Sequence, residues 1–81
     1  MVKTLTYSDL RRTLTRLGFE EHSVPGGIVF WEDQTQTRLT LPEMPLDAPL
    51  EARHLSVARA IVVSSGLAGS DDFERALEQA A

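Results

Sequence analysis

A turn near the middle of the chain constrains its fold more than any other feature. Pro25-Gly26-Gly27 separates a short polar segment from the apolar run Ile28-Val29-Phe30-Trp31. Glycine supplies the positive φ that a tight hairpin requires, and β-branched and aromatic residues favour strands. The pattern therefore predicts two antiparallel strands, Phe19 to Val24 and Ile28 to Asp33, that meet at this turn.

A third strand is predicted from Thr37 to Leu41. Its sequence alternates polar and apolar residues, which is typical of a strand with one solvated face. The polar stretch Gln34-Thr35-Gln36 is expected to form the turn before it. Pro42 ends the strand because proline has no N–H to donate to a neighbouring strand. The proline-rich segment from Pro42 to Pro49 is predicted to be a surface loop.

A first helix is predicted ahead of these strands. Its apolar positions recur at i, i+4 and i+7, as Leu10, Leu14 and Leu17. Thr6 or Ser8 can cap its start, and Gly18 stands where a left-handed residue ends a helix.

Two further helices are predicted after the strands. The one from Ser56 to Ser65 must be held by packing, because its valines lower the intrinsic helix propensity. Ser70-Asp71-Asp72 opens the last helix, with acids in the first turn where the helix dipole favours them. Phe73 and Leu77 form its apolar stripe.

The 81 residues are expected to form a single domain, spanning positions 1–81, that buries about 60% of the surface of its unfolded chain. The chain has no cysteine, so disulfides and thiolate zinc sites are excluded, and tight packing or self-association must supply stability. Its longest apolar runs, Ile28 to Trp31 and Ala60 to Val63, are far below the roughly 20 residues of a membrane span. The first residues show no signal peptide, so we expect a cytoplasmic protein with no membrane contact.

The net charge of −4 is unevenly distributed. Residues 1–19 carry +3, residues 20–51 carry −6 and the remainder carries −1. Nucleic-acid affinity comes largely from phosphate contacts, so the acidic middle predicts weak RNA binding or none. The candidate RNA-binding residues are Arg11, Arg12, Arg16 and Arg38, although three arginines on one helix are also what a solvated face would show.

The acidic pairs are not expected to bind a metal. Glu20-Glu21 and Glu32-Asp33 lie on strands, where adjacent side chains point to opposite faces, and Asp71-Asp72 lies at a helix start. We therefore predict solvated carboxylates, no metal site and no cofactor.

The order helix, three-stranded meander, helix, with a short C-terminal helix, resembles the double-stranded-RNA-binding-like fold of the α+β class, with the helices packed against an antiparallel sheet. From Tyr7 to Phe73 the chain further resembles the HicA family, the toxin half of a bacterial toxin-antitoxin pair. The matching residues are Leu10, Leu14, Leu17, Gly18, Phe19, Gly26, Leu41, Pro42, Ala58, Ile61, Val62, Ser65, Gly66, Leu67 and Phe73. The resemblance implies messenger RNA cleavage by a histidine in a Gly-Ser-His turn, and a HicB-type antitoxin that covers the site.

The sequence departs from that pattern at the turn itself. The Gly-Ser-His positions read Gly26-Gly27-Ile28, and an isoleucine side chain can neither accept nor donate a proton. The basic residues that commonly follow the histidine are replaced by Phe30-Trp31-Glu32-Asp33. We therefore predict no catalytic residue and the loss of the family's ribonuclease activity.

The only two histidines offer alternatives to the missing one. His22 in the first strand could be oriented by a neighbouring carboxylate and act as a base, or it could be an exposed strand residue whose acidic neighbours point to the other face. His54, just ahead of the second helix, is expected to bond to backbone.

The apolar run has two faces. In a strand, Ile28 and Phe30 point to one side of the sheet while Val29 and Trp31 point to the other. If the helices cover one side only, Val29 and Trp31 form an exposed patch of the kind that marks an interface. The alternative is that the last helix, or the proline-rich loop with Met44 and Leu46, covers that side.

The leading functional prediction is therefore a HicA-like bacterial protein without nuclease activity that binds itself, as a homodimer, or a HicB-like antitoxin. Two other hypotheses remain: a ribonuclease with an atypical site around His22 or Arg38, and a weak RNA-binding module that uses the arginines of the first helix.

Overall fold

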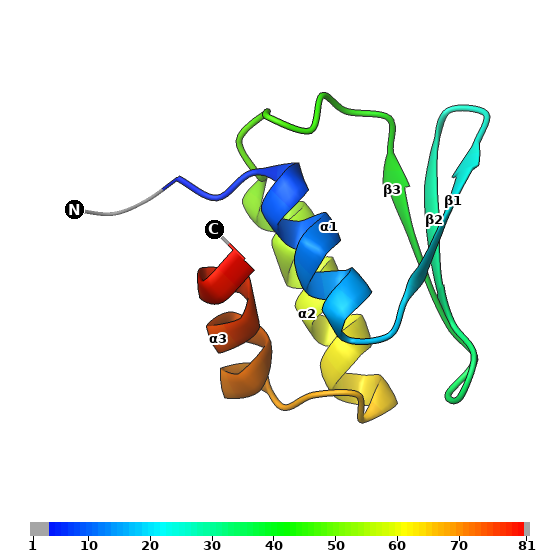
Figure 1. Ribbon diagram of the computed structural model, residues 1–81, viewed down its shortest axis with the longest axis vertical. Coiled ribbons are helices and arrows are strands. Elements are labelled where there is room, and N and C mark those ends of the chain that lie inside the picture. The colour runs from blue at the N-terminus through cyan, green and yellow to red at the C-terminus, as the bar shows by residue number, and fades with distance from the viewer. Residues whose placement is uncertain (1–3, 81) are drawn as a thin grey trace.

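The predicted α+β architecture is confirmed. The computed structural model describes residues 4–80 and contains three helices and three strands in the order α1 (Tyr7–Arg16), β1 (Glu20–Val24), β2 (Gly27–Glu32), β3 (Thr37–Pro42), α2 (Ala52–Ser65) and α3 (Ser70–Ala80) (Figure 1). The start of the N-terminal segment, where no signal peptide is expected, lies outside the described residues.

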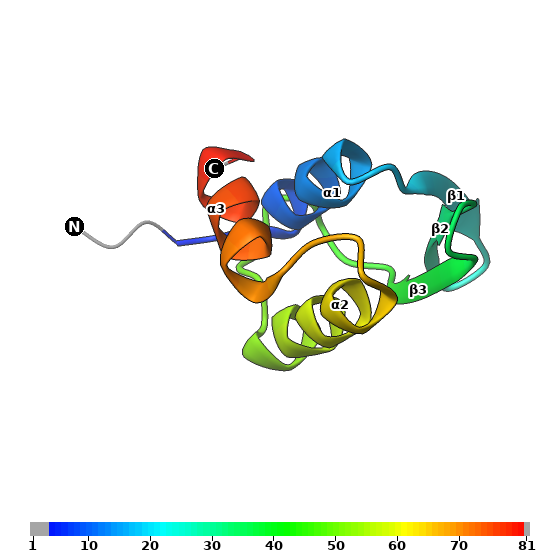
Figure 2. The same ribbon diagram turned by 90° about the horizontal axis from the view of Figure 1, so that it is seen from below.

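The chain is arranged in layers. The three strands form one antiparallel sheet in the order β1-β2-β3, with β2 in the centre. α1 and α2 lie side by side on one face of this sheet, and α3 packs against both of them on the side away from the sheet (Figure 2). The helices thus leave the opposite face of the sheet without a covering helix.

The β1–β2 hairpin is tighter than the sequence predicted. Its loop consists of Pro25 and Gly26 alone, and Gly27 is already the first residue of β2, where it pairs with Val24. Gly26 has a φ of 82°, which is the left-handed value that glycine adopts at the second position of such a turn.

The hydrophobic core lies between the inner face of the sheet and the helices. Phe30 on β2 and Leu39 on β3 are each 1% exposed. They pack against residues from all three helices and from the segment before β1, which are Leu10, Leu14, Phe19, Ala58, Val62, Phe73 and Leu77. The predicted apolar positions of α1 and α3 therefore point into this core, except that Leu17 lies at its edge.

Helix α1 begins and ends as its sequence predicts. Thr6 is the N-cap, and its side chain and that of Asp9 bond to each other's backbone N–H groups in a capping box. Gly18, just past the end of the helix, has a φ of 102° and redirects the chain toward β1.

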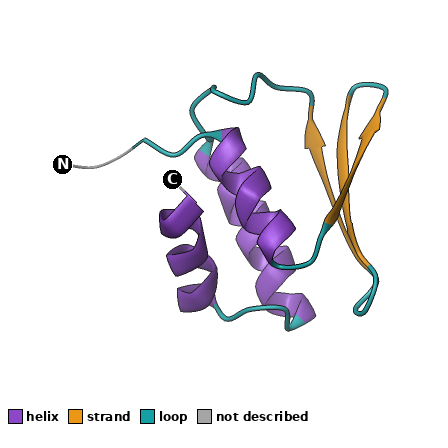
Figure 3. Cartoon of the chain, viewed as in Figure 1, coloured by secondary structure: helices purple, strands orange, loops and turns teal. Residues whose placement is uncertain are grey.

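The proline-rich loop between β3 and α2 is tied to the first turn of α1 (Figure 3). The N–H groups of Tyr7 and Ser8 donate to the carbonyl oxygens of Ala48 and Leu46, at 3.3 and 2.9 Å. The first N–H groups of a helix have no partner inside the helix, so this loop satisfies two of them. It thereby lies over the open end of the inner sheet face.

Helix α2 begins four residues earlier than predicted, at Ala52. The backbone carbonyl of Glu51 accepts hydrogen bonds from the N–H groups of His54 and Leu55, both at 3.1 Å, which closes the first turn. Ala58 and Val62 are fully buried, as expected for a helix held by packing, whereas Val57 and Val63 remain exposed.

We predict that Gly27→Ala destabilises the protein by about 1–3 kcal/mol, because the added methyl group would stand 2.4 Å from the backbone oxygen of Leu41, which cannot move without breaking the sheet. Urea denaturation followed by circular dichroism measures the loss. Gly26→Asn is the control: the space around Gly26 is open and asparagine tolerates a positive φ, so a smaller loss is expected. Equal losses in the two variants would contradict the close contact.

Candidate functional site

Ile28, which stands where the resembled family has its histidine, lies on the inner face at the start of β2. Its side chain is half-buried and packs against the core. On one side Tyr7, Met44 and Leu46 pack around it and leave only about 10 Å³ of space, and its other side lines an open groove. That volume is at the lower limit for one water molecule, so no substrate fits on the side of Ile28 that faces Tyr7.

A shallow groove of about 310 Å³ runs beside Ile28, and it is acidic. Its charged lining residues are Arg11, Glu21 and Glu43. Arg11 is held by Glu21 in an ion pair of 2.7 Å, which leaves Glu43 as the excess charge. A net negative groove repels a phosphodiester backbone, and its one guanidinium is already engaged.

His22 lies on the opposite, outer face of the sheet, and its side chain is 60% exposed. The expectation that its acidic neighbours point away is correct for Glu21 but wrong for Glu20. Glu20 is two residues away, so it shares the face of His22, and its Oε2 lies 3.6 Å from His22 Nε2. Both side chains are open to solvent, and neither lines the grooves beside Ile28 or between α1 and α3.

His54 is bonded to a side chain and not, as predicted, to backbone. Its Nδ1 lies 2.6 Å from the hydroxyl of Tyr7 and 3.6 Å from Oε2 of Glu51. Tyr7 Oη also accepts the backbone N–H of Glu51 at 3.4 Å. This contact joins the first turns of α1 and α2 across 47 residues of sequence, and no spacing in the sequence indicates it.

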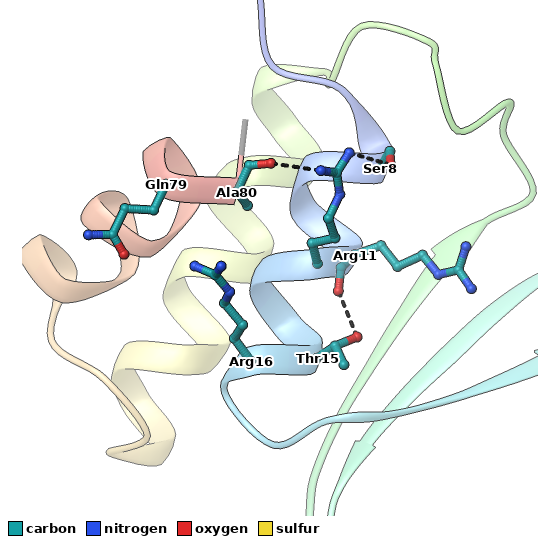
Figure 4. Close-up of a pocket in the computed structure, with 7 residues that line it drawn as sticks. Ser8, Arg11, Thr15, Arg16, Gln79 and Ala80 are labelled. Carbon is teal, nitrogen blue, oxygen red and sulfur yellow. Dashed lines mark hydrogen bonds between the residues drawn. The ribbon is translucent and has the colours of Figure 1, made fainter.

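The arginines of α1 point to different surfaces (Figure 4). Arg11 extends toward the sheet, where it meets Glu21, whereas Arg16 extends toward α3. Arg12 donates to the backbone oxygen of Ala80 and to Ser8 Oγ, both at 3.1 Å. Arg12 and Arg16 line an open groove of about 540 Å³ between α1 and α3, and Arg11 borders it.

Arg38, the fourth candidate for RNA binding, is exposed on the outer face of β3, next to Trp31 in the strand register. The sheet separates it from α1. The four predicted RNA-binding arginines therefore do not form one continuous surface.

The outer face of the sheet, opposite the helices, has no covering helix among residues 4–80. We define it by the side chains that alternate away from the core, which are Glu20, His22, Val24, Val29, Trp31, Arg38 and Thr40. The alternative coverings that the sequence left open are excluded for the described residues. Phe73 and Leu77 of α3 lie in the core, and Met44 and Leu46 of the loop lie beside Ile28 on the inner side.

Val29 and Trp31, the predicted interface residues, therefore form an apolar centre on this face. Each is only half-buried, and neighbouring Val24 is 40% exposed. The indole N–H of Trp31 lies 3.5 Å from Asp33 Oδ1, so only its polar edge has a partner.

Glu32 organises the turn at the far end of β2. Its carboxylate accepts hydrogen bonds from the N–H groups of Gln34 and Thr35, both at 2.8 Å, and from the hydroxyl of Thr35. Hydrogen bonds from the side chain and the backbone of Thr35 lower the pKa of Glu32 below its ordinary value of 4.5, against the opposing effect of burial. Glu32, which the sequence predicted to be solvated together with Asp33, is therefore buried and stabilises the turn.

Comparison with known proteins gives no match: no family model, no curated protein and no solved structure resembles this chain significantly. Within residues 4–80, no three histidine, cysteine or acidic residues cluster as metal ligands would. No helix in that range is both long and apolar enough to cross a bilayer.

The lowered pKa of Glu32 predicts a defined loss of stability in acid. Because the folded pKa lies below the unfolded one, the carboxylate's contribution is fully present above about pH 4.5 and is lost as the pH falls through the folded value. Glu32→Gln is expected to be less stable than the unchanged protein at neutral pH and to lose less stability on acidification. Urea denaturation at neutral and acidic pH tests this, with exposed Glu78→Gln as the control. An unchanged pH dependence in Glu32→Gln would refute the assignment.

Proposed function

We propose that this chain is a HicA-like bacterial protein that has lost ribonuclease activity and acts by binding a protein through the outer face of its sheet. The observation that carries the proposal is the apolar centre that Val29 and Trp31 form on the sheet face opposite the helices. A small domain rarely leaves a central strand apolar on both faces unless the second face has a partner.

The loss of catalysis is supported by the surroundings of Ile28. The position that would carry the proton-transferring side chain is apolar, and the loop residues Met44 and Leu46 pack against it. General acid-base catalysis needs an ionisable group within hydrogen-bonding reach of the substrate, and neither histidine meets this need. His54 is engaged with Tyr7 inside the protein, and His22 lies on a flat open surface.

Association through the outer face is also energetically reasonable. A large apolar side chain contributes roughly 1.5–3 kcal/mol when it goes from exposed to fully buried. Val29 and Trp31 are half-buried already, so each offers a part of this amount. The partner in this proposal is a HicB-like antitoxin or a second copy of the chain, and a HicB-like gene next to this one would favour the antitoxin.

The first test is catalytic. Expression in a bacterial host is expected not to arrest growth, and the purified protein is expected to leave messenger RNA intact, because Ile28 cannot transfer a proton and the net negative groove beside it repels a phosphodiester backbone. Growth curves and gel analysis of incubated RNA measure both. Cleavage that is present in the unchanged protein and absent in His22→Ala would overturn the proposal and identify His22 as the base.

The second test concerns RNA affinity. Of the three arginines that line the groove between α1 and α3, Arg11 is paired with Glu21, so at most about two phosphates are neutralised there. The affinity for duplex RNA should therefore fall with salt with a logarithmic slope no steeper than about −2. Filter binding at several salt concentrations measures the slope. The double variant Arg12→Ala, Arg16→Ala should remove this salt dependence. Arg11→Ala should change the slope little, because the Arg11 guanidinium is paired with Glu21. Tight binding to duplex RNA with a much steeper slope would contradict the proposal that the chain acts mainly by binding a protein.

A further inference from the structure

The outer face of the sheet carries an ordered row of charges. Glu20, Trp31 and Arg38 are direct neighbours across β1, β2 and β3. Residues that oppose each other in an antiparallel sheet point to the same face, so the row reads carboxylate, indole, guanidinium from one edge to the other.

The two charges of this row are open to a partner. The side chain of Glu20 is 74% exposed, and its only ion pair among residues 4–80 is the one with His22 at 3.6 Å. Arg38 is exposed and takes part in none of the ion pairs found among the same residues. Within one chain, the backbones at Glu20 and Arg38 are two strand spacings apart, roughly 10 Å, with Trp31 between them, and no ion pair joins their side chains.

This row is complementary to itself under one kind of symmetry only. If two sheets stack face to face about a two-fold axis parallel to the strands, β1 of one copy lies over β3 of the other. The Glu20 of each copy then meets Arg38 of the other copy. These two contacts lie on either side of a contact between the two Trp31 rings. If the axis instead runs across the strands, Glu20 faces Glu20 and Arg38 faces Arg38, and like charges repel.

The neighbouring row fits the same arrangement. His22, Val29 and Thr40 are also direct neighbours across the three strands. With the axis along the strands, Val29 meets Val29 and His22 lies over Thr40 of the second copy. No like charges face each other in either row.

We propose that the partner of the outer face is a second copy of this chain, in a two-fold dimer whose axis runs parallel to the strands and which pairs Glu20 with Arg38 across the interface. This inference rests on the proposed function, because it names the partner of the same surface. The strands of two stacked sheets cross at about 30°. The strands of the two copies are therefore best aligned near the two-fold axis, where Trp31 and Val29 lie.

The size of the face predicts how strong the dimer is. Three strands spaced about 4.8 Å apart, with about 3.3 Å per residue, give a footprint of roughly 300 Å². Stable interfaces bury about 800 Å² per partner, so we expect this dimer to be weak and to dissociate reversibly on dilution.

Exchange of the charges tests both the dimer and its symmetry. Glu20→Arg and Arg38→Glu are each expected to weaken self-association by about tenfold, because two attractive contacts become repulsive. An equimolar mixture of the two variants is expected to associate as well as the unchanged protein, since in the mixed dimer opposite charges meet again at both contacts. Sedimentation equilibrium between about 20 μM and 1 mM measures the constants.

Two controls carry the same changes of net charge away from the face. Arg53→Glu at the start of α2 and Glu78→Arg on α3 are both exposed and should leave the dimer constant unchanged. The emission of Trp31, the only tryptophan, is expected to shift to shorter wavelength as the dimer forms.

Each other outcome overturns the inference. A protein that is monomeric up to about 1 mM has no such dimer, and single variants that associate as well as the unchanged protein exclude the pairing of Glu20 with Arg38. Neither result bears on the proposed loss of nuclease activity, which the RNA cleavage assay tests. Neither bears on binding to an antitoxin, which is tested with a HicB-like partner.

Discussion

Phe30 packs at the centre of the inner sheet face, and the rest of the structure depends on this contact. It is 1% exposed and belongs to one core with leucines of α1 and β3 and with Phe73 of α3. A chain of 81 residues has only enough apolar side chains to build one such core, so a single face of the sheet is covered. The alternation of side chains along β2 then places Val29 and Trp31 outside, as a direct consequence of burying Phe30.

The same packing explains why position 28 is unsuited to chemistry. Ile28 is two residues before Phe30, so it shares the inner face and extends the core toward the loop that holds Met44 and Leu46. A histidine at this position would have to be accommodated under that loop or displace it. An apolar residue at position 28 therefore suits the side on which it packs against Met44 and Leu46.

Local features of the fold could be predicted from the sequence, because each depends on residues close together in the chain. Thr6, Gly18 and the glycines of the β1–β2 turn mark the ends of elements by their own conformational preferences. Period-two alternation likewise identified the two faces of β2. The contact of His54 with Tyr7 and the pairing of Arg11 with Glu21 could not be predicted, since they depend on how separate elements are brought together. The sequence also suggested RNA binding as a common role for the arginines of α1, whereas Arg11 points toward the sheet and Arg16 points toward α3.

An open sheet of three strands also has two unpaired edges, and their composition decides how the chain avoids aggregation. The exposed edge strand β1 is only five residues long and carries Glu20, Glu21 and His22 in succession before Pro25 ends it. Short, charged edges bounded by proline do not template the addition of further strands. Such edges disfavour growth of the sheet into a fibril, while its apolar face remains open to a partner. The protein thus combines an edge strand that disfavours amyloid-like addition of strands with an apolar sheet face that a second copy would cover in the proposed dimer.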